Sequence, residues 1–356
     1  MHLTSSQNTM KQANTSSSHP YQAVEHIKLG ADDMNQVLAI IHDATKPLVF
    51  EGLCEHFPIV QAGLDSSDSA MAYLQRFNAD KPIIGYKIAS EHQGRVFYND
   101  ELTGFNYSAG QAPLAVVLDH LKQEQQTPTG TGIYMGSTDV QQFFPGFAEQ
   151  NTLQLGGLSP LTNLWLGNQT NVAAHFDFPL NLACNLVGRR RFTLFPPEQI
   201  ANLYIGPMEF APGGQPISMV NVEQPDFDKF PKFKLAQAQA QQVELNPGDV
   251  LFIPSMWWHQ VTGVDDFNVL LTHWWRDTPG FMGRPNNSLM HAMLSLRSLP
   301  KAQRQAWKAI FDYYIFNDEL DDNQHIPQGA QGMLTTPLDE LNARKLRADL
   351  SNKLRR

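Results

Sequence analysis

The stretch from Asn163 to Pro197 reads NLWLGNQTNVAAHFDFPLNLACNLVGRRRFTLFPP, and the organisation of the whole chain follows from it. At its centre an imidazole and a carboxylate, His175 and Asp177, lie two residues apart. On a β-strand, alternate side chains point to the same face, so a strand here would project both groups together. The apolar residues around the pair favour a strand in the interior of the protein.

A second marker follows later in the chain, in the segment NPGDVLFIPSMWWHQV (246–261), where a Gly-Asp turn precedes an apolar strand that ends near His259. Two imidazoles and one carboxylate form the facial triad that holds non-haem Fe(II) and leaves positions open for other ligands. The sequence therefore predicts a catalytic metal site made by His175, Asp177 and His259. The alternative is a His-x-Asp pair that is only hydrogen-bonded. An uncompensated buried charge is costly, however, and a bound metal ion would compensate the charge of Asp177.

Three segments carry a resemblance to a known family: HFDFPLNLACNLVGRRRFTLFPPEQ (175–199), PDFDKFPKF (225–233) and PGDVLFIPSMWWHQV (247–261). Together they resemble the cupin-like, JmjC-type 2-oxoglutarate oxygenases, especially the asparaginyl hydroxylases that modify hypoxia-inducible factor. The resemblance extends roughly from Lys46 to Trp275. It implies a mainly β fold with flanking helices, whose core is a double-stranded β-helix (a cupin or jelly roll). It also implies Fe(II) as the metal and 2-oxoglutarate as cosubstrate.

The resemblance also points to residues that would bind 2-oxoglutarate. Tyr134, in a short strand after a glycine turn, matches a tyrosine that contacts the distal carboxylate, although it could equally pack at a sheet edge. The family's cosubstrate lysine falls at Arg190, and arginine can hold a carboxylate through two hydrogen bonds without losing its charge. Asn181, six residues after His175, is expected on the same strand face, either as a cosubstrate contact or as a buried amide bonded to backbone.

Two further positions bear on the pocket. His273 lies fourteen residues after His259, so both side chains could face inward, and His273 is a candidate cosubstrate residue. Val172 stands where relatives often have a threonine or serine hydroxyl for 2-oxoglutarate, which is a departure from the family pattern. The paired tryptophans near both histidines are expected to pack in the core.

Composition limits the remaining choices. The chain has 356 residues, 42% of them hydrophobic, and a formal net charge of −9, which counts against binding to a phosphate backbone. Its two cysteines give no disulfide framework and fit a reducing cytoplasm. No apolar run is long enough to span a membrane. Residues 1–20 are polar and are expected to form a disordered leader.

The domain organisation expected from the sequence is a leader at 1–20, an oxygenase domain at 21–278 and a helical region at 279–356. Helices are expected at 32–44 and 66–77, and a long Gly- and Pro-rich excursion at 198–235 should cover the binding site or form a surface insertion. Relatives use such C-terminal helices to form a homodimer, so a homodimer is expected here.

The function expected from the resemblance is 2-oxoglutarate-dependent hydroxylation, with a protein or peptide as the favoured substrate and a small molecule as the alternative. A nucleic-acid substrate is disfavoured by the acidity of the chain. Two other classes stay open. One is a cupin that binds metal without redox activity, and the other is a metalloenzyme that acts on a small molecule without 2-oxoglutarate.

Overall fold

The computed structural model describes residues 20–317 and 322–355. The expected leader therefore lies outside the described residues, apart from Pro20. The chain divides into two compact units, Met1–Arg276 and Asp277–Arg356.

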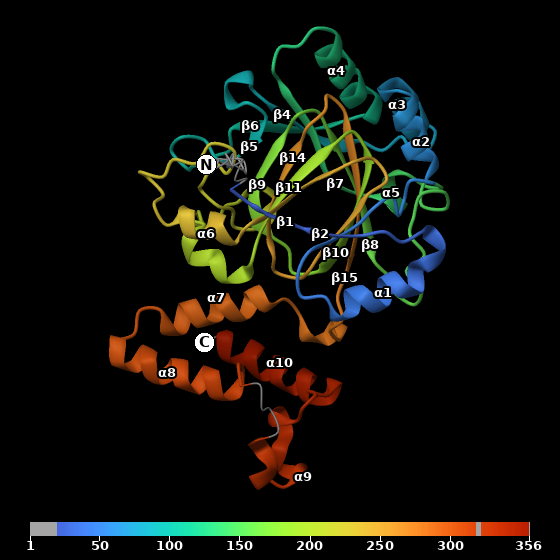
Figure 1. The fold of residues 1–356 in the computed structure, drawn as a ribbon. Coiled ribbons are helices and arrows are strands. Elements are labelled where there is room, and N and C mark those ends of the chain that lie inside the picture. The colour runs from blue at the N-terminus through green and yellow to red at the C-terminus, as the bar shows by residue number, and fades with distance from the viewer. Residues whose placement is uncertain (1–19, 318–321, 356) are drawn as a thin grey trace, which may run out of the picture. The chain divides into compact units, whose positions relative to one another are not determined.

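The first unit is built on two β-sheets (Figure 1). The smaller sheet has six strands, in the order β1 (Gln22–Ala23), β12 (Gln241–Leu245), β11 (Arg190–Phe195), β14 (Trp258–Gly263), β9 (Asn171–Phe176) and β5 (Arg95–Val96). Its central strands β11, β14 and β9 are antiparallel to one another. The short strand β5 joins β9 in parallel at one edge.

The larger sheet has nine strands, in the order β2 (Glu25–Ile27), β3 (Leu48–Phe50), β13 (Val250–Ile253), β10 (Leu180–Val187), β15 (Asn268–Trp275), β8 (Leu161–Gly167), β7 (Gly132–Asp139), β4 (Ile83–Ile88) and β6 (Tyr107–Ala112). From β8 to β11, successive strands alternate between the two sheets: β8 and β10 belong to the larger sheet, and β9 and β11 to the smaller. The expectation of a mainly β, cupin-like fold is confirmed.

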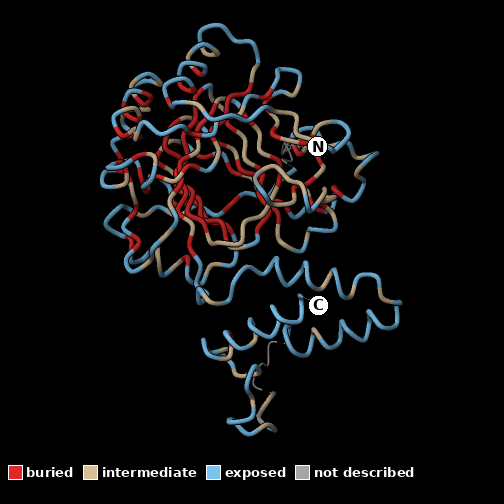
Figure 2. The backbone as a smooth tube through the Cα atoms, turned by 180° about the vertical axis from the view of Figure 1, so that it is seen from behind, coloured by how far each residue is buried: buried red, intermediate tan, exposed pale blue. Residues whose placement is uncertain are grey.

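The apolar layer between the sheets explains why the strands are so hydrophobic. Side chains from both sheets are buried together there, among them Ala183 and Leu251 of the larger sheet and Phe192 and Leu194 of the smaller one. Burial of apolar area contributes roughly 25 cal/mol per Å², so this layer is a principal source of stability. Figure 2 shows the buried residues concentrated in the interior of this unit.

Helices cover the outer face of the larger sheet. They are α1 (Met34–Asp43), α2 (Pro58–Asp65), α3 (Ser67–Gln75), α4 (Leu114–Gln126) and the short α5 (Val140–Phe143). Their apolar faces pack with strand residues in one large cluster. The helices expected at 32–44 and 66–77 correspond to α1 and α3. The helix α2 was not expected, because Pro58 reads as a loop residue although proline is well tolerated in the first turn of a helix.

The excursion at 198–235 packs on the outer face of the smaller sheet. It contains short 3-10 turns and leads into α6 (Phe233–Gln239). Buried residues from the excursion, such as Leu203 and Val220, cluster with Ala174 and Phe195 of the sheet. The Ser218 N–H donates to the Ala174 carbonyl (2.8 Å), which fixes the excursion against β9. The segment is therefore an ordered covering layer of the strand that carries His175.

The second unit is helical, with α7 (Pro285–Leu296), α8 (Lys301–Tyr314), α9 (Gln328–Gln331) and α10 (Glu340–Leu354). Among its described residues, Ala343 is the sole buried apolar side chain, and the tube in Figure 2 is exposed along nearly all of this unit. Many large apolar side chains are at least one-third exposed, including Leu294, Trp307, Ile310 and Phe316. In the described part of the chain, no helix is both long enough and apolar enough to cross a membrane.

The turn between β10 and β11 gives a test of the fold. Gly188 has φ of 69°, and a Cβ there would lie 2.4 Å from the Phe267 carbonyl oxygen. Gly188→Ala should therefore lower the free energy of unfolding by about 2 kcal/mol or more, measured by urea denaturation. Gly110→Ala in β6 is the control, because a Cβ at Gly110 meets nothing within 4 Å. Equal stability of the two variants would contradict the described turn.

Candidate functional site

The pairing of β9 with β14 brings together the two histidines that the sequence singles out. In this antiparallel ladder His259 lies directly opposite His175, and a register shift follows between His259 and Val261. The ring centroids of the two imidazoles are 4.3 Å apart. His175 and His259 of the predicted triad are therefore cross-strand neighbours on one face of the smaller sheet.

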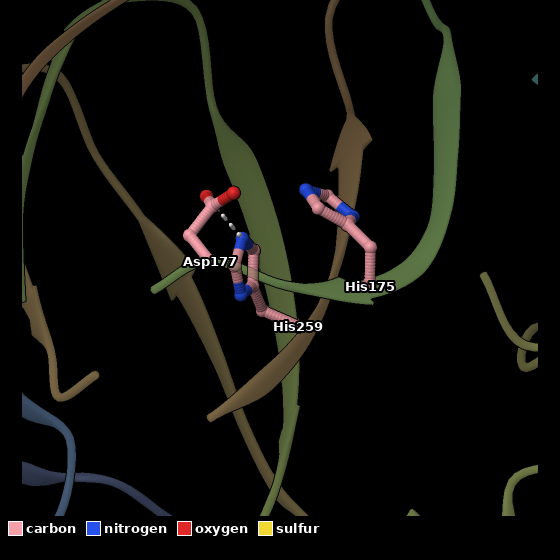
Figure 3. A group of neighbouring side chains, drawn as sticks. All are labelled: His175, Asp177 and His259. Carbon is pink, nitrogen blue, oxygen red and sulfur yellow. Dashed lines mark ion pairs between the residues drawn. The ribbon is translucent and has the colours of Figure 1, made fainter. Parts of the chain in front are cut away.

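Asp177 completes the group (Figure 3). Strand β9 ends at Phe176, so Asp177 lies just past the strand instead of within it. Its backbone carbonyl accepts a hydrogen bond from Met256 N–H (2.9 Å) in the loop before His259. The Asp177 Oδ2 atom is 3.6 Å from His259 Nε2, and one potential ligand atom from each of the three residues lies within 4.8 Å of the others.

Backbone carbonyls orient both imidazoles. His175 Nδ1 is 2.9 Å from the Ala173 carbonyl oxygen, and His259 Nδ1 is 3.0 Å from the Trp257 carbonyl oxygen. A carbonyl can only accept, so Nδ1 carries the proton in each ring and Nε2 has a free lone pair. That tautomer is the one in which Nε2 binds a metal while the other nitrogen is held in place.

Burial and neighbouring groups set the protonation states of His175 and Asp177. Desolvation, helped by the neighbouring His259, lowers the pKa of His175 to about 4, so its ring is neutral near pH 7. Burial by itself would raise the pKa of Asp177, but the neighbouring imidazoles of His259 and His175 lower it overall. His175 thus presents a neutral imidazole and Asp177 an ionised carboxylate, which are the forms that ligate a divalent metal.

A cavity between the two sheets contains the triad. Residues of the larger sheet line one side, namely Tyr134, Trp165, Asn181, Leu270, Thr272 and Trp274. Residues of the smaller sheet and the loop after β9 line the other, namely Val172, His175, Asp177, Arg190, Phe192, His259 and Val261. The walls are mostly apolar with a few polar groups, which is typical of a small-molecule site.

Arg190 is a buried cation in this cavity. It is 6% exposed, and among the ion pairs of the described residues none involves it. Burial lowers its pKa to about 10, and the nearby Tyr134 opposes this shift. Burial also raises the pKa of Tyr134, so that side chain keeps its phenolic proton as a donor. Its neighbours Arg189 and Arg191 point to the other face and pair with Asp265, Glu244 and Glu223.

Three buried polar atoms of the cavity wall have no hydrogen-bond partner among the residues described: Asn181 Oδ1, Arg190 Nε and Trp274 Nε1. Buried polar groups in native proteins are nearly always paired. The donor set of the triad fits a divalent metal. The two unpaired donors of the cavity wall, Arg190 Nε and Trp274 Nε1, fit an anionic organic acid beside the metal.

Two sequence expectations need correction. Asn181 is not on the strand of His175 but on β10 in the opposite sheet, and it reaches the same cavity from the other side. His273 faces away from the cavity. Its Nε2 is 2.9 Å from Thr152 Oγ1 and its Nδ1 is 3.8 Å from Cys184 Sγ. His273 is fully buried in the layer beneath the helices, so the structure separates it from the triad.

Other cavity residues were missed by sequence reasoning. Trp274 was expected only to pack in the core, yet it lines the cavity, as do Trp165 and Thr272, for which no role was expected. Because side chains alternate along β15, Thr272 and Trp274 could have been predicted as cavity residues if it had been known which face of the strand points to the cavity. Val172 also lines the cavity, so the residue that replaces the family's hydroxyl is at the site and contributes an apolar surface.

The neutral state of His175 predicts a pH dependence of stability. The folded protein protonates His175 only near pH 4, whereas the unfolded chain does so near 6.5. Between these values the unfolded state binds more protons, so the metal-free protein should lose stability as pH falls from about 6.5 towards 4. Urea unfolding in chelator should show a weaker dependence in His175→Gln. An identical slope in both proteins would mean that His175 is not held neutral.

Comparisons with known proteins agree with this geometry. A cupin-like domain family matches residues 35–281. The chain is 39% identical to HSPB1-associated protein 1 homolog of Danio rerio over 32% of this chain and 25% of that protein. It is 33% identical to Lysine-specific demethylase JMJ31 of Arabidopsis thaliana over 32% of this chain and 20% of that protein.

A longer match is to tRNA wybutosine-synthesizing protein 5 of Mus musculus, with 27% identity over 54% of this chain and 53% of that protein. The chain thus spans about half or less of the curated relatives that it matches. The family match covers more than half of this chain and includes all three triad residues. The protein therefore belongs to the cupin-like domain family, of JmjC type.

Proposed function

We propose that this protein is an Fe(II)- and 2-oxoglutarate-dependent hydroxylase. The observation that carries the proposal is Arg190, a buried cation that shares a cavity with the His175, Asp177 and His259 triad. A buried charge without a partner is strongly unfavourable. An organic acid that bridges the metal and Arg190 would neutralise it.

Each residue then has a defined role. His175 Nε2, His259 Nε2 and the Asp177 carboxylate would hold Fe(II), which when bound supplies the redox chemistry for dioxygen-dependent hydroxylation. Arg190 would hold the distal carboxylate of 2-oxoglutarate through two parallel hydrogen bonds. The Tyr134 hydroxyl would donate to the same carboxylate, and Asn181 would contact the acid nearer the metal. The apolar walls exclude water from the site.

The favoured substrate is a protein side chain, because one relative is named a lysine-specific demethylase and another an HSPB1-associated protein. The acidic net charge of −9 is unfavourable for nucleic acid, although a third relative is named for tRNA wybutosine synthesis. Both cysteines are buried free thiols, and we place the protein in the cytoplasm on that ground.

The cosubstrate assignment is tested by anaerobic addition of Fe(II) and 2-oxoglutarate, followed by the visible charge-transfer band of the chelate. The wild-type protein should show the band and His175→Ala should not. Arg190→Met should weaken 2-oxoglutarate binding about 100-fold, because a buried charge-assisted pair is lost. Arg191→Met is the matched control, since Arg191 is on the same strand but pairs outside the cavity with Glu223 and Glu244; its affinity should be unchanged.

The result also separates the competing functions. Bound iron without a band would favour a cupin that does not use 2-oxoglutarate, or a metalloenzyme that acts on a small molecule. Turnover of 2-oxoglutarate that persists in Asp177→Ala would contradict the triad itself.

We also propose that the helical unit at 277–356 forms a homodimer. With Ala343 as the sole buried apolar residue in its described part, this unit has too little core of its own to account for three long helices. Exposed apolar side chains on α7 and α8, such as Leu294, Trp307 and Ile310, could be buried against a second copy.

The homodimer is tested with the double variant Trp307→Glu and Ile310→Glu, which places charges on the apolar side chains of α8. Sedimentation velocity should give a dimer for the wild type and a monomer for the variant. Lys308→Gln is the control, because Lys308 is 67% exposed at its side chain and pairs with Asp312 within the helix; it should remain dimeric. A monomeric wild-type protein would overturn the proposal.

A further inference from the structure

We infer that Trp274 is a direct contact of the bound oxo acid, with its indole N–H donating to the carboxylate that lies beside the metal. This inference rests on the proposed function and adds a residue to its binding site. It concerns a side chain that the sequence identified only as a packing residue.

The position of Trp274 on β15 places it at the cavity. Alternate residues of this strand have opposite surroundings: Thr272 and Trp274 line the cavity, whereas Trp275 belongs to the apolar layer beneath the helices. Trp274 is paired directly with Asn181 of β10. Both side chains have a buried polar atom without a partner, Trp274 Nε1 and Asn181 Oδ1.

Nearby tryptophans show that this fold normally satisfies an indole donor. Trp165, whose ring meets that of Trp274 edge to face with centroids 5.7 Å apart, donates from Nε1 to Thr272 Oγ1 (2.9 Å). Trp257 donates from Nε1 to the Thr45 carbonyl oxygen (3.1 Å). An unpaired buried donor reduces stability, and the Trp274 N–H makes no hydrogen bond to any described residue, so it is free to donate to a ligand.

The ladders of the two sheets indicate which end of the acid Trp274 contacts. Arg190 is opposite Gly263, whereas Leu194 of the same strand is opposite His259, so Arg190 and the triad lie at opposite ends of the β11–β14 ladder. Asn181, the partner of Trp274, follows Asp177 closely in the chain and is paired with Ile253 at the end of β13. Trp274 therefore lies at the metal end, where it would donate to the carboxylate that chelates the metal.

An indole N–H is well suited to this position. It donates and cannot accept or ionise, so it favours a carboxylate oxygen and adds no charge to a site that already has Arg190. A hydrogen bond to an ionised acceptor is also stronger than one between neutral groups.

The test compares Trp274→Phe with Trp275→Phe as the control. Trp275 is the next residue on the same strand, and its indole lies outside the cavity, in the apolar layer beneath the helices. Anaerobic titration of each Fe(II)-loaded protein with 2-oxoglutarate, followed by the chelate band, should give a dissociation constant about tenfold higher for Trp274→Phe. Trp275→Phe should match the wild type. Equal dissociation constants for all three proteins would overturn the inference while leaving the proposed function intact.

A second measurement does not depend on catalysis. In the wild-type protein loaded with Zn(II), 2-oxoglutarate should move one of the six tryptophan indole N–H resonances downfield, and that resonance should be missing from Trp274→Phe. If no indole resonance moves although 2-oxoglutarate binds, Trp274 is only a wall residue. If the wild-type protein binds no 2-oxoglutarate with either metal, the proposed function fails and this inference fails with it.

Discussion

The cross-strand pairing of His175 with His259 is the contact on which the site depends. It joins two distant parts of the chain in one ladder and places two imidazoles 4.3 Å apart in the interior. Each ring is oriented by a carbonyl two residues earlier in the chain, that of Ala173 within β9 or that of Trp257 just before β14. Because the backbone supplies these acceptors, the orientation of the rings follows from strand geometry and requires no further side chain.

The surrounding elements hold the backbone segments that carry the three triad residues. The excursion packs on the outer face of β9 through the Ser218 hydrogen bond to Ala174, next to His175 in the chain. The loop before β14 is tied to Asp177 through Met256 N–H. These contacts support the backbone of the three ligands from outside the cavity, so the cavity itself remains available for ligands.

The sequence predicts the residue types of the site better than their positions. His175, Asp177 and His259 could be found because few other arrangements place imidazoles and a carboxylate in buried strands. The direction of His273 could not be found by counting from His259, because a register shift within β14 and a turn intervene. The prediction that Asn181 lies on the strand of His175 was also wrong. The chain crosses to the other sheet between these two residues, where Pro179 interrupts the apolar run.

The charges of the cavity connect the two proposed ligands. Without the metal and the organic acid, the cavity contains one ionised carboxylate, Asp177, and one cation, Arg190, at opposite ends. A divalent metal alone, or a dianionic acid alone, would leave two uncompensated charges in an environment of low dielectric constant, where such an imbalance is costly. Both together restore neutrality. Each ligand should therefore bind more tightly in the presence of the other, and the reciprocity of binding linkage makes that gain equal in the two directions.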